Sequence, residues 1–451
     1  MNELDIKDKY GTFDNIDMPY RCSKTSTLCD MVIIFTRWIL PTIQIFLMSA
    51  FIDEVVKFVR IRNGINAMYF LPYLIGLVFI MAIDEILGCI STITEEKIKS
   101  ALRIKYKPTL IKKYMSLDYS KVEDKETNEL YKLVSDKAET KLFVFYRSFV
   151  TIIGITIQVL GYLLIIMNKS IVSGIVIILF IPLVLFISAY WGRNKYKVEI
   201  VNERYSMRNR HLNKILTDKD SVMERTLFGW SDRLAKQWRA NNHYVSKEKR
   251  NNIKQWLIHL KGISVFMQLT IMFIAFTLLH DVITYRMTVG LYISLIQAAI
   301  NISSVMSWDF SDNINKVAES KSYYQTLTQF AHLSADRDNL IAPINDVNFN
   351  TIEFINVSFS YPNTEKKILS NLSFKIEKGK KYAFVGLNGA GKTTIVKLIT
   401  GIYYDFSGEI LIDGKSIKEY SLGYLRGLSS VLFQDYSKYY LSLYDNASMR
   451  V

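Results

Sequence analysis

The stretch that decides the fold of the C-terminal part reads Gly386-Leu387-Asn388-Gly389-Ala390-Gly391-Lys392-Thr393-Thr394. It follows the apolar run 382–385 and matches the phosphate-binding pattern G-x-x-x-x-G-K-[ST] at every fixed position. Glycines let the backbone approach an anion closely, and a helix expected over 394–400 adds the positive end of its dipole. We therefore predict a nucleotide-binding loop between a buried strand and a helix.

Two side chains of this loop have individual roles in the prediction. The Lys392 ammonium group can reach the terminal phosphates, and the Thr393 hydroxyl can coordinate Mg²⁺. We therefore expect a nucleoside triphosphate with Mg²⁺ as the cofactor, bound by all nine residues of the stretch. A simple glycine turn is the alternative.

The composition indicates a membrane protein. Hydrophobic residues make up 50% of the 451 residues, and they gather in long runs. The formal net charge is +14, but the basic residues flank apolar segments, which favours loops beside a bilayer and argues against a nucleic-acid-binding protein. Three cysteines, Cys22, Cys29 and Cys89, show no C-x-x-C spacing, so we expect free thiols.

Six apolar segments are long enough to cross a bilayer. We predict spans over 27–52, 67–90, 148–167, 171–191, 262–279 and 289–308. Pro41 is expected to kink the first span. Charges inside the first two spans, Arg37 and the pair Asp84 and Glu85, indicate neighbouring protein or water.

The two longest loops, 92–147 and 192–261, are rich in lysine and arginine. The positive-inside rule therefore places both loops, and both termini, in the cytoplasm. Glycine and proline are scarce in these loops and apolar residues recur at helical spacing, so they are expected to extend the spans as helices. Short breaks are predicted at 117–124 and 217–225.

The sequence divides into four parts. Residues 1–26 form a cytoplasmic N-terminal segment, 27–334 the six-helix transmembrane domain, 335–350 a linker, and 351–451 a nucleotide-binding domain. The fold class expected is a membrane α-helical domain with long cytoplasmic extensions, joined to a partial α/β P-loop NTPase domain. In the latter, strands are predicted over 352–359, 368–376, 380–385, 408–412 and 428–433.

Six spans, two long loops and a C-terminal P-loop resemble a half-transporter of the ATP-binding cassette (ABC) exporters. Tyr361, in Val357-Ser358-Phe359-Ser360-Tyr361-Pro362, matches the aromatic residue of the A-loop, which the resemblance implies stacks on the adenine of ATP; a packed tyrosine at a strand end is the alternative. Gln434, in Val431-Leu432-Phe433-Gln434-Asp435, matches the Q-loop glutamine, with an implied catalytic role at Mg²⁺ or the attacking water.

The resemblance also implies partners and a location. The breaks at 117–124 and 217–225 are similar to the coupling helices of these exporters; solvated helical turns are the alternative. A second half-transporter, identical or different, would complete the unit in the plasma membrane, with the nucleotide-binding domain in the cytoplasm. The stretch 433–440 is similar to the Q-loop of lantibiotic and bacteriocin exporters, which points to a peptide cargo.

The chain departs from the family after Gln434. A signature loop, a Walker B aspartate, a catalytic glutamate and a switch histidine are not found in the 451 residues, and no histidine follows the P-loop. We therefore expect ATP binding without hydrolysis by this C-terminally truncated chain, and a C-terminal domain of limited stability because strand edges are uncovered. A fragment of a complete exporter gene explains the missing motifs most simply, and a deliberately truncated regulator is the alternative; the missing motifs in an adjacent reading frame would decide for the fragment. A catalytically silent partner or nucleotide sensor is the alternative function; a P-loop kinase has no supporting motif.

Polar side chains inside the predicted spans are candidates for lining a passage, although helix packing explains each of them more simply. They are Arg37, Gln44, Gln158, Gln268, Gln297 and Asn301.

Overall fold

The computed structural model describes residues 6–60, 67–179, 182, 205–219, 221–334, 342–345, 347–362, 364–432 and 439–447. The chain divides into two compact units. The first, here named the helical unit, comprises Tyr10–Tyr106 and Lys137–Gln325. The second, named the P-loop unit, comprises Met1–Lys9, Lys107–Asp136 and Thr326–Val451.

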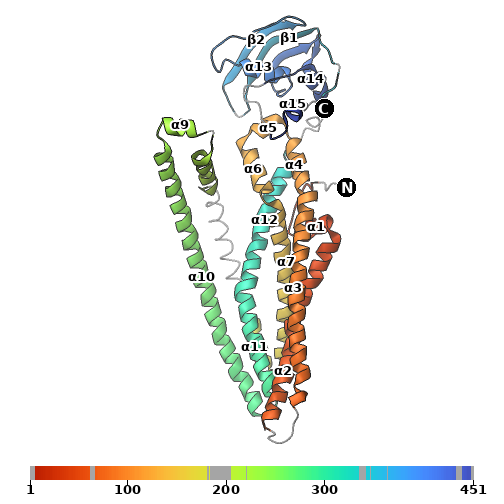
Figure 1. Ribbon diagram of the computed structural model, residues 1–451, viewed down its shortest axis with the longest axis vertical. Helices are drawn as coiled ribbons and strands as arrows, with labels where there is room; N and C mark the ends of the chain where they lie inside the picture. Colours follow the sequence, from red (N-terminus) through yellow and green to blue (C-terminus); the bar gives the residue numbers. More distant parts are fainter. Residues whose placement is uncertain are drawn as a thin grey trace. The chain divides into compact units, whose positions relative to one another are not determined.

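The helical unit is built from long helices (Figure 1). Residues 171–179 and 205–217 are also helical. A π-helical turn, η2, joins the last two long helices, and α12 runs on into the P-loop unit. The bounds are α1 Asp14–Cys22, α2 Lys24–Arg60, η1 Ala67–Tyr69, α3 Leu71–Lys105, α7 Ala138–Lys169, α9 Val222–Leu227, α10 Ser231–Ile283, α11 Val289–Ser304, η2 Val305–Phe310 and α12 Ser311–Ala331.

Five helices in the described part of the chain are long and apolar enough to cross a membrane, and they correspond to five of the six predicted spans. The remaining span, 171–191, is helical over 171–179, and most of the rest lies outside the described residues. Helix α2 continues through Pro41. The candidate spans are Lys24–Val59, Leu71–Met115, Ala138–Lys169, Val265–Ile283 and Val289–Ala331.

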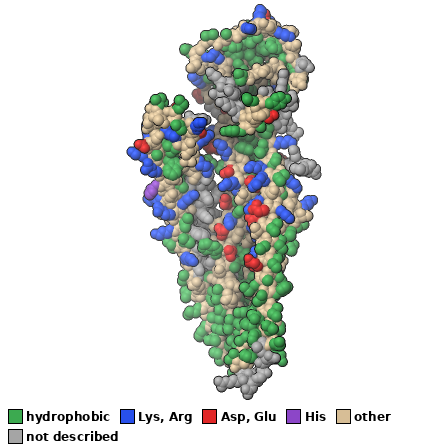
Figure 2. All heavy atoms as spheres, viewed as in Figure 1, with side chains coloured by type: hydrophobic (Ala, Val, Ile, Leu, Met, Phe, Trp, Pro, Cys, Tyr) green, Lys and Arg blue, Asp and Glu red, His purple; other side chains and the backbone are tan. Residues whose placement is uncertain are grey.

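Side-chain chemistry along the helical unit agrees with these spans. Figure 2 shows hydrophobic side chains covering the lower part of this unit on the visible face, with lysine, arginine, aspartate and glutamate concentrated above. Exposed apolar residues on the candidate spans include Phe79 at 64%, Leu164 at 71% and Phe276 at 75%. Contiguous apolar surface of this kind is rare on soluble proteins, so the helical unit is that of a multi-pass membrane protein.

The core of the helical unit lies where α2, α7, α10 and α11 pack together. Gly290 allows α11 to approach α2 closely, since a Cβ there would lie 2.2 Å from the Ser49 carbonyl oxygen. The Gly290 N–H donates to Asp53 Oδ1 over 2.7 Å. This bond satisfies one of the amides that the start of a helix leaves without a partner.

A buried carboxylate joins three helices near the start of α2. Asp30 is 0% exposed, and its Oδ1 accepts hydrogen bonds from Ser91 at 3.2 Å and Thr94 at 3.0 Å on α3. On α7, Tyr146 donates to Oδ2 over 3.1 Å, and Arg147 forms an ion pair at 2.7 Å. Because a buried charge is tolerated only when it is paired and hydrogen-bonded, this network fixes the three helices to one another.

The charges predicted inside the first two spans are also paired. Arg37 Nε donates to Asp84 Oδ1 over 2.8 Å, and a second guanidinium nitrogen donates to Oδ2 over 3.2 Å. The prediction that neighbouring protein accommodates these charges is therefore confirmed for Arg37 and Asp84.

The P-loop unit combines a small sheet with short helices (Figure 1). The strand order is β2-β1-β3-β4, and every pair is antiparallel. Helix α5 lies in the break predicted at 117–124. The bounds are α4 Lys107–Met115, α5 Tyr119–Glu123, α6 Lys125–Ser135, β1 Thr351–Ser360, β2 Lys367–Glu377, α13 Lys392–Ile399, β3 Ser407–Ile412, β4 Lys415–Ser416, η4 Ile417–Glu419, α14 Leu422–Leu428 and α15 Leu443–Ala447.

Three of the five predicted strands are present as β1, β2 and β3, and two predictions are wrong. Residues 380–385 have no strand structure, and Val385 is 95% exposed. Residues 429–432 are also irregular, residue 428 ends α14, and 433 lies outside the described residues. A strand forms only when a neighbouring strand completes its hydrogen-bond ladder. Among the described residues, no parallel strands are present between which either segment could pair.

The Asp30 network gives a stability prediction. Arg147→Met leaves a buried carboxylate without its cation, so we expect the free energy of unfolding to fall by about 3 kcal/mol, measured as thermal or denaturant unfolding of the full chain in detergent. Arg21→Met is the matched control, because the Arg21–Asp17 pair is exposed and lies within one helix; we expect a loss under about 0.5 kcal/mol. Equal losses of unfolding free energy in Arg147→Met and Arg21→Met would show that the buried ion pair stabilises the fold no more than the exposed one.

Candidate nucleotide site

The predicted phosphate-binding loop has the backbone of an anion site, although the strand expected before it is not formed. Gly389 and Gly391 have φ values of +83° and +90°, which glycine adopts without strain. Helix α13 starts directly after Gly391, and the Ile395 N–H donates to the Gly391 carbonyl oxygen over 3.1 Å. The amides of residues 392–394 therefore face the loop with the positive end of the helix dipole.

Lys392 places its charge inside the loop. Its ammonium group donates to the carbonyl oxygens of Gly386 at 2.8 Å and Leu387 at 2.9 Å. The Thr393 side chain next to it is exposed. The Lys392 ammonium, the exposed Thr393 hydroxyl and the amides of the first helical turn form a set of donors that suits phosphate oxygens. The residues present therefore fit a nucleoside triphosphate and a Mg²⁺ ion.

Tyr361 lies beside the helix that follows the loop. Its hydroxyl group is 3.0 Å from Thr394 Oγ1, and the Thr394 side chain is 3% exposed. Its ring meets the Phe359 and Tyr403 rings edge-on, with centroids 5.2 and 5.5 Å away. Tyr361 is thus brought to the loop, while its stacking on adenine stays a prediction.

The remaining predicted site residue, Gln434, lies outside the described residues, as do 433 and 435–438 of its stretch. Residues 386–390 are exposed and follow the irregular segment 380–385. Two residues beside Tyr361, Lys397 and Tyr403, were not singled out by the sequence. Their contacts come from tertiary packing, and no motif spacing carries a signal for them.

Three of the six polar candidates in the spans come together. Gln297 donates to Asn301 over 3.2 Å on α11, and Gln158 donates to the Tyr162 hydroxyl over 3.1 Å on α7. Tyr162, missed by the sequence analysis, also packs in one core cluster with the α11 residues Leu295 and Ala298, and so connects the two helices. Of the other three, Arg37 is paired with Asp84, Gln44 is partly exposed and Gln268 is exposed.

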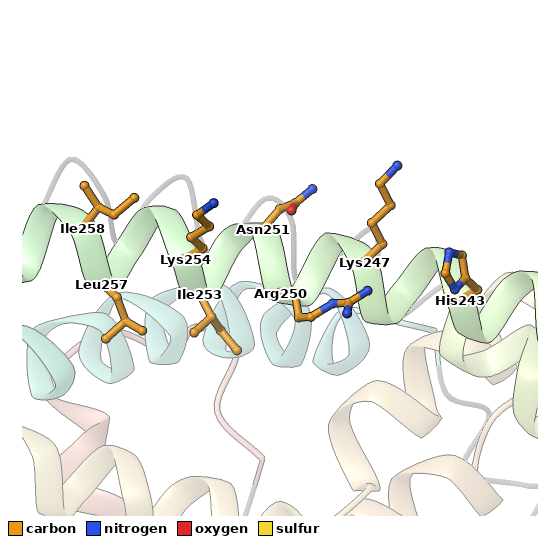
Figure 3. Close-up of a pocket in the computed structure, with 8 residues that line it drawn as sticks. All are labelled: His243, Lys247, Arg250, Asn251, Ile253, Lys254, Leu257 and Ile258. Atoms are coloured by element: carbon orange, nitrogen blue, oxygen red, sulfur yellow. The ribbon is translucent and has the colours of Figure 1, made fainter.

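A hollow along α10 lies outside the candidate nucleotide site (Figure 3). The labelled residues that line it all belong to this one helix, and they mix basic and aliphatic side chains. They are His243, Lys247, Arg250, Asn251, Ile253, Lys254, Leu257 and Ile258. Since one helix supplies every described lining residue, the hollow is an open flank of α10 and adds nothing to the nucleotide site.

Fold and loop together define a membrane protein with a nucleotide-binding region in the same chain. The comparison of families agrees, because residues 369–449 match the ABC transporter family. The resemblance to ABC exporters is therefore confirmed: the chain carries an ABC transporter domain after a set of apolar helices.

Two relatives are similar to the chain over most of its length. The subtilin transport ATP-binding protein of Bacillus subtilis is 25% identical over 90% of this chain and 66% of its own length. The nisin transport ATP-binding protein of Lactococcus lactis subsp. lactis is 24% identical over 91% of this chain and 67% of its own length. The ATP-dependent lipid A-core flippase of Photobacterium profundum is 40% identical over 25% of this chain. The chain thus spans about two thirds of the length of the first two relatives.

The loop geometry gives a prediction for Gly391→Ala. A Cβ there would lie 2.7 Å from a Leu369 methyl group on a backbone at φ +90°, so we expect the free energy of unfolding to fall by about 1 to 2 kcal/mol. Gly386→Ala is the control, because its Cβ would meet only the Ala390 Cβ, at 3.4 Å. Thermal unfolding of the two full-length variants measures the difference, and a smaller loss for Gly391→Ala than for Gly386→Ala contradicts the argument.

Proposed function

We propose that the chain binds ATP and Mg²⁺ at residues 386–394 and serves as one half of a dimeric ABC exporter. The observation that supports this most directly is the loop itself, in which Lys392 and the free amides at the start of α13 converge, in a chain that also carries apolar helices. The two relatives that are similar to most of the chain are both named as transport ATP-binding proteins.

Each site residue has a role in this proposal. Lys392 contacts the terminal phosphates as a point charge, and Thr393 coordinates Mg²⁺. Tyr361 stacks on the adenine ring, and Gln434 acts at Mg²⁺ or the attacking water. ATP supplies free energy of binding and hydrolysis; the protein orients it through backbone amides that need no rearrangement.

The wider arrangement belongs to the same proposal. Residues 117–124 and 217–225 transmit closure of the nucleotide-binding domains to the spans, which switch from inward- to outward-facing. The partner is a second half-transporter, identical or different. The chain lies in the plasma membrane with the P-loop domain and both termini in the cytoplasm, and its domains run 1–26, 27–334, 335–350 and 351–451.

The cargo we propose is a peptide of the lantibiotic or bacteriocin type. The stretch 433–440 suggested it, and the names of the subtilin and nisin relatives agree. ATP-dependent uptake of such a peptide into inside-out membrane vesicles tests it. Uptake that requires ATP supports peptide export, whereas transport of lipid but of no peptide contradicts it.

A catalytically silent membrane partner or nucleotide sensor, which binds ATP without turning it over, is the second candidate. Phosphate release from the purified chain, alone and mixed with a complete half-transporter, separates the two. Turnover by the chain itself would contradict the silent function.

Lys392→Ala tests nucleotide binding. Because a charge-assisted contact to phosphate is lost, we expect photolabelling by 8-azido-ATP to fall about ten-fold or more. Lys415→Ala is the control: Lys415 is an exposed lysine of the same unit that pairs with Glu419 at 3.6 Å, and labelling should be unchanged. Equal labelling of wild type and Lys392→Ala would contradict the proposed function.

A further inference from the structure

Behind the P-loop, the Lys397 ammonium group lies among three tyrosine rings and one carboxylate. Its Nζ is 5.3 Å from the Tyr361 ring centroid, 5.6 Å from that of Tyr403 and 5.4 Å from that of Tyr119. It also lies 3.4 Å from Glu123 Oε1, and the Lys397 side chain is only 14% exposed. Ring faces and a carboxylate both attract a cation, so the ammonium is held from several sides.

These partners come from two distant parts of the sequence within the P-loop unit. Tyr119 and Glu123 are the first and last residues of α5, whereas Lys397 belongs to α13. Tyr403, which is 4% exposed, donates its hydroxyl hydrogen to Glu123 Oε2. Both oxygens of the Glu123 carboxylate therefore hold groups that pack around the P-loop helix.

The Tyr403 hydroxyl is a permanent donor in this cluster. Burial, followed by the hydrogen bond and charge of Glu123, raises the pKa of Tyr403 far above its ordinary value. The hydroxyl group therefore stays protonated at neutral pH and continues to donate to the carboxylate. The Tyr119 and Tyr403 rings also meet edge-on, 5.7 Å apart, which adds an apolar contact between α5 and the sheet region.

The cluster ends on the ring that is proposed to bind adenine. Tyr361 has the Lys397 ammonium over its ring, the Tyr403 ring edge-on at 5.5 Å and Thr394 Oγ1 at 3.0 Å from its hydroxyl group. A continuous set of contacts thus connects Glu123 in α5 to Tyr361.

We propose that Glu123 and Lys397 are positioning residues for Tyr361, so that segment α5 regulates the affinity of the site for the adenine base. The proposal rests on the proposed function, in which Tyr361 stacks on the base of ATP. With its carboxylate partner the ammonium stays over the ring and fixes the ring's position. Without that partner, Lys397 turns toward water and the ring loses its support. Affinity for phosphate alone is unaffected, because these residues reach the nucleotide only through Tyr361.

The test compares two ligands on the full-length chain in lipid nanodiscs with Mg²⁺: ATP, and inorganic tripolyphosphate, which has no base. For Glu123→Gln we expect ATP affinity to fall about five-fold, the loss of roughly one cation–π contact, and tripolyphosphate affinity to stay unchanged. Lys397→Met should behave alike, and Lys397→Arg, which keeps a cation over the rings, should restore most of the ATP affinity.

A double-mutant cycle with Tyr361→Ala isolates the route. In that background Glu123→Gln should have no further effect on ATP affinity, because the ring through which it acts is gone. Glu129→Gln is the matched control: it lies in the neighbouring helix α6 and pairs with Lys125 on the surface at 3.9 Å, and we expect wild-type affinities for both ligands.

Three results overturn the proposal: equal losses for ATP and tripolyphosphate, no change for either ligand, or an undiminished effect in the Tyr361→Ala background. Failure of the proposed function gives a different pattern, since wild-type chain would then bind neither ligand in a manner sensitive to Lys392→Ala. A general loss of folding shows as a lowered unfolding temperature for both Glu123→Gln and Lys397→Arg, and it leaves the ratio of the two affinities unchanged.

Discussion

Backbone hydrogen bonding is the constraint on which the larger unit depends. A chain inside hydrocarbon has no water to satisfy its N–H and C=O groups, so each segment must form its own bonds and becomes helical. This explains why α2 remains one helix through Pro41. The same lack of water makes an unpaired buried charge costly, and two charged side chains of this unit, Asp30 and Arg37, are paired. Asp30 has four donors and Arg37 has Asp84, and each pairing connects helices that are far apart in sequence.

The same rule, applied to strands, accounts for the part of the fold that the sequence did not predict. Helices satisfy their bonds locally, so the local residue pattern was enough to predict five spans and the break that contains α5. A strand depends on partners elsewhere in the chain. The antiparallel strands β1, β2 and β3 have theirs, whereas the segment 380–385, predicted as a strand, has none among the described residues and stays irregular. The residue pattern of this segment is typical of a strand, but a strand also needs a neighbouring strand to pair with, and the pattern does not show whether one is present.

The candidate site divides in the same way. The glycines and Lys392 form a local motif, and their backbone geometry followed from spacing alone. Tyr361 required a family resemblance to be noticed at all. Lys397 and Tyr403 left no trace in the sequence, since their importance arises from a cluster that joins residues about 280 positions apart, as in the Tyr403–Glu123 pair. Contacts of that range become visible only when the fold is known.

The bond between Asp53 and the first turn of α11 has a mechanical consequence. Gly290 leaves room for nothing larger than hydrogen against the Ser49 carbonyl, and the carboxylate holds the adjoining amide. Helices α2 and α11 are therefore held together at this contact. If the two helices separate during a working cycle, the separation is largest at the ends far from Gly290 and smallest at Gly290 itself.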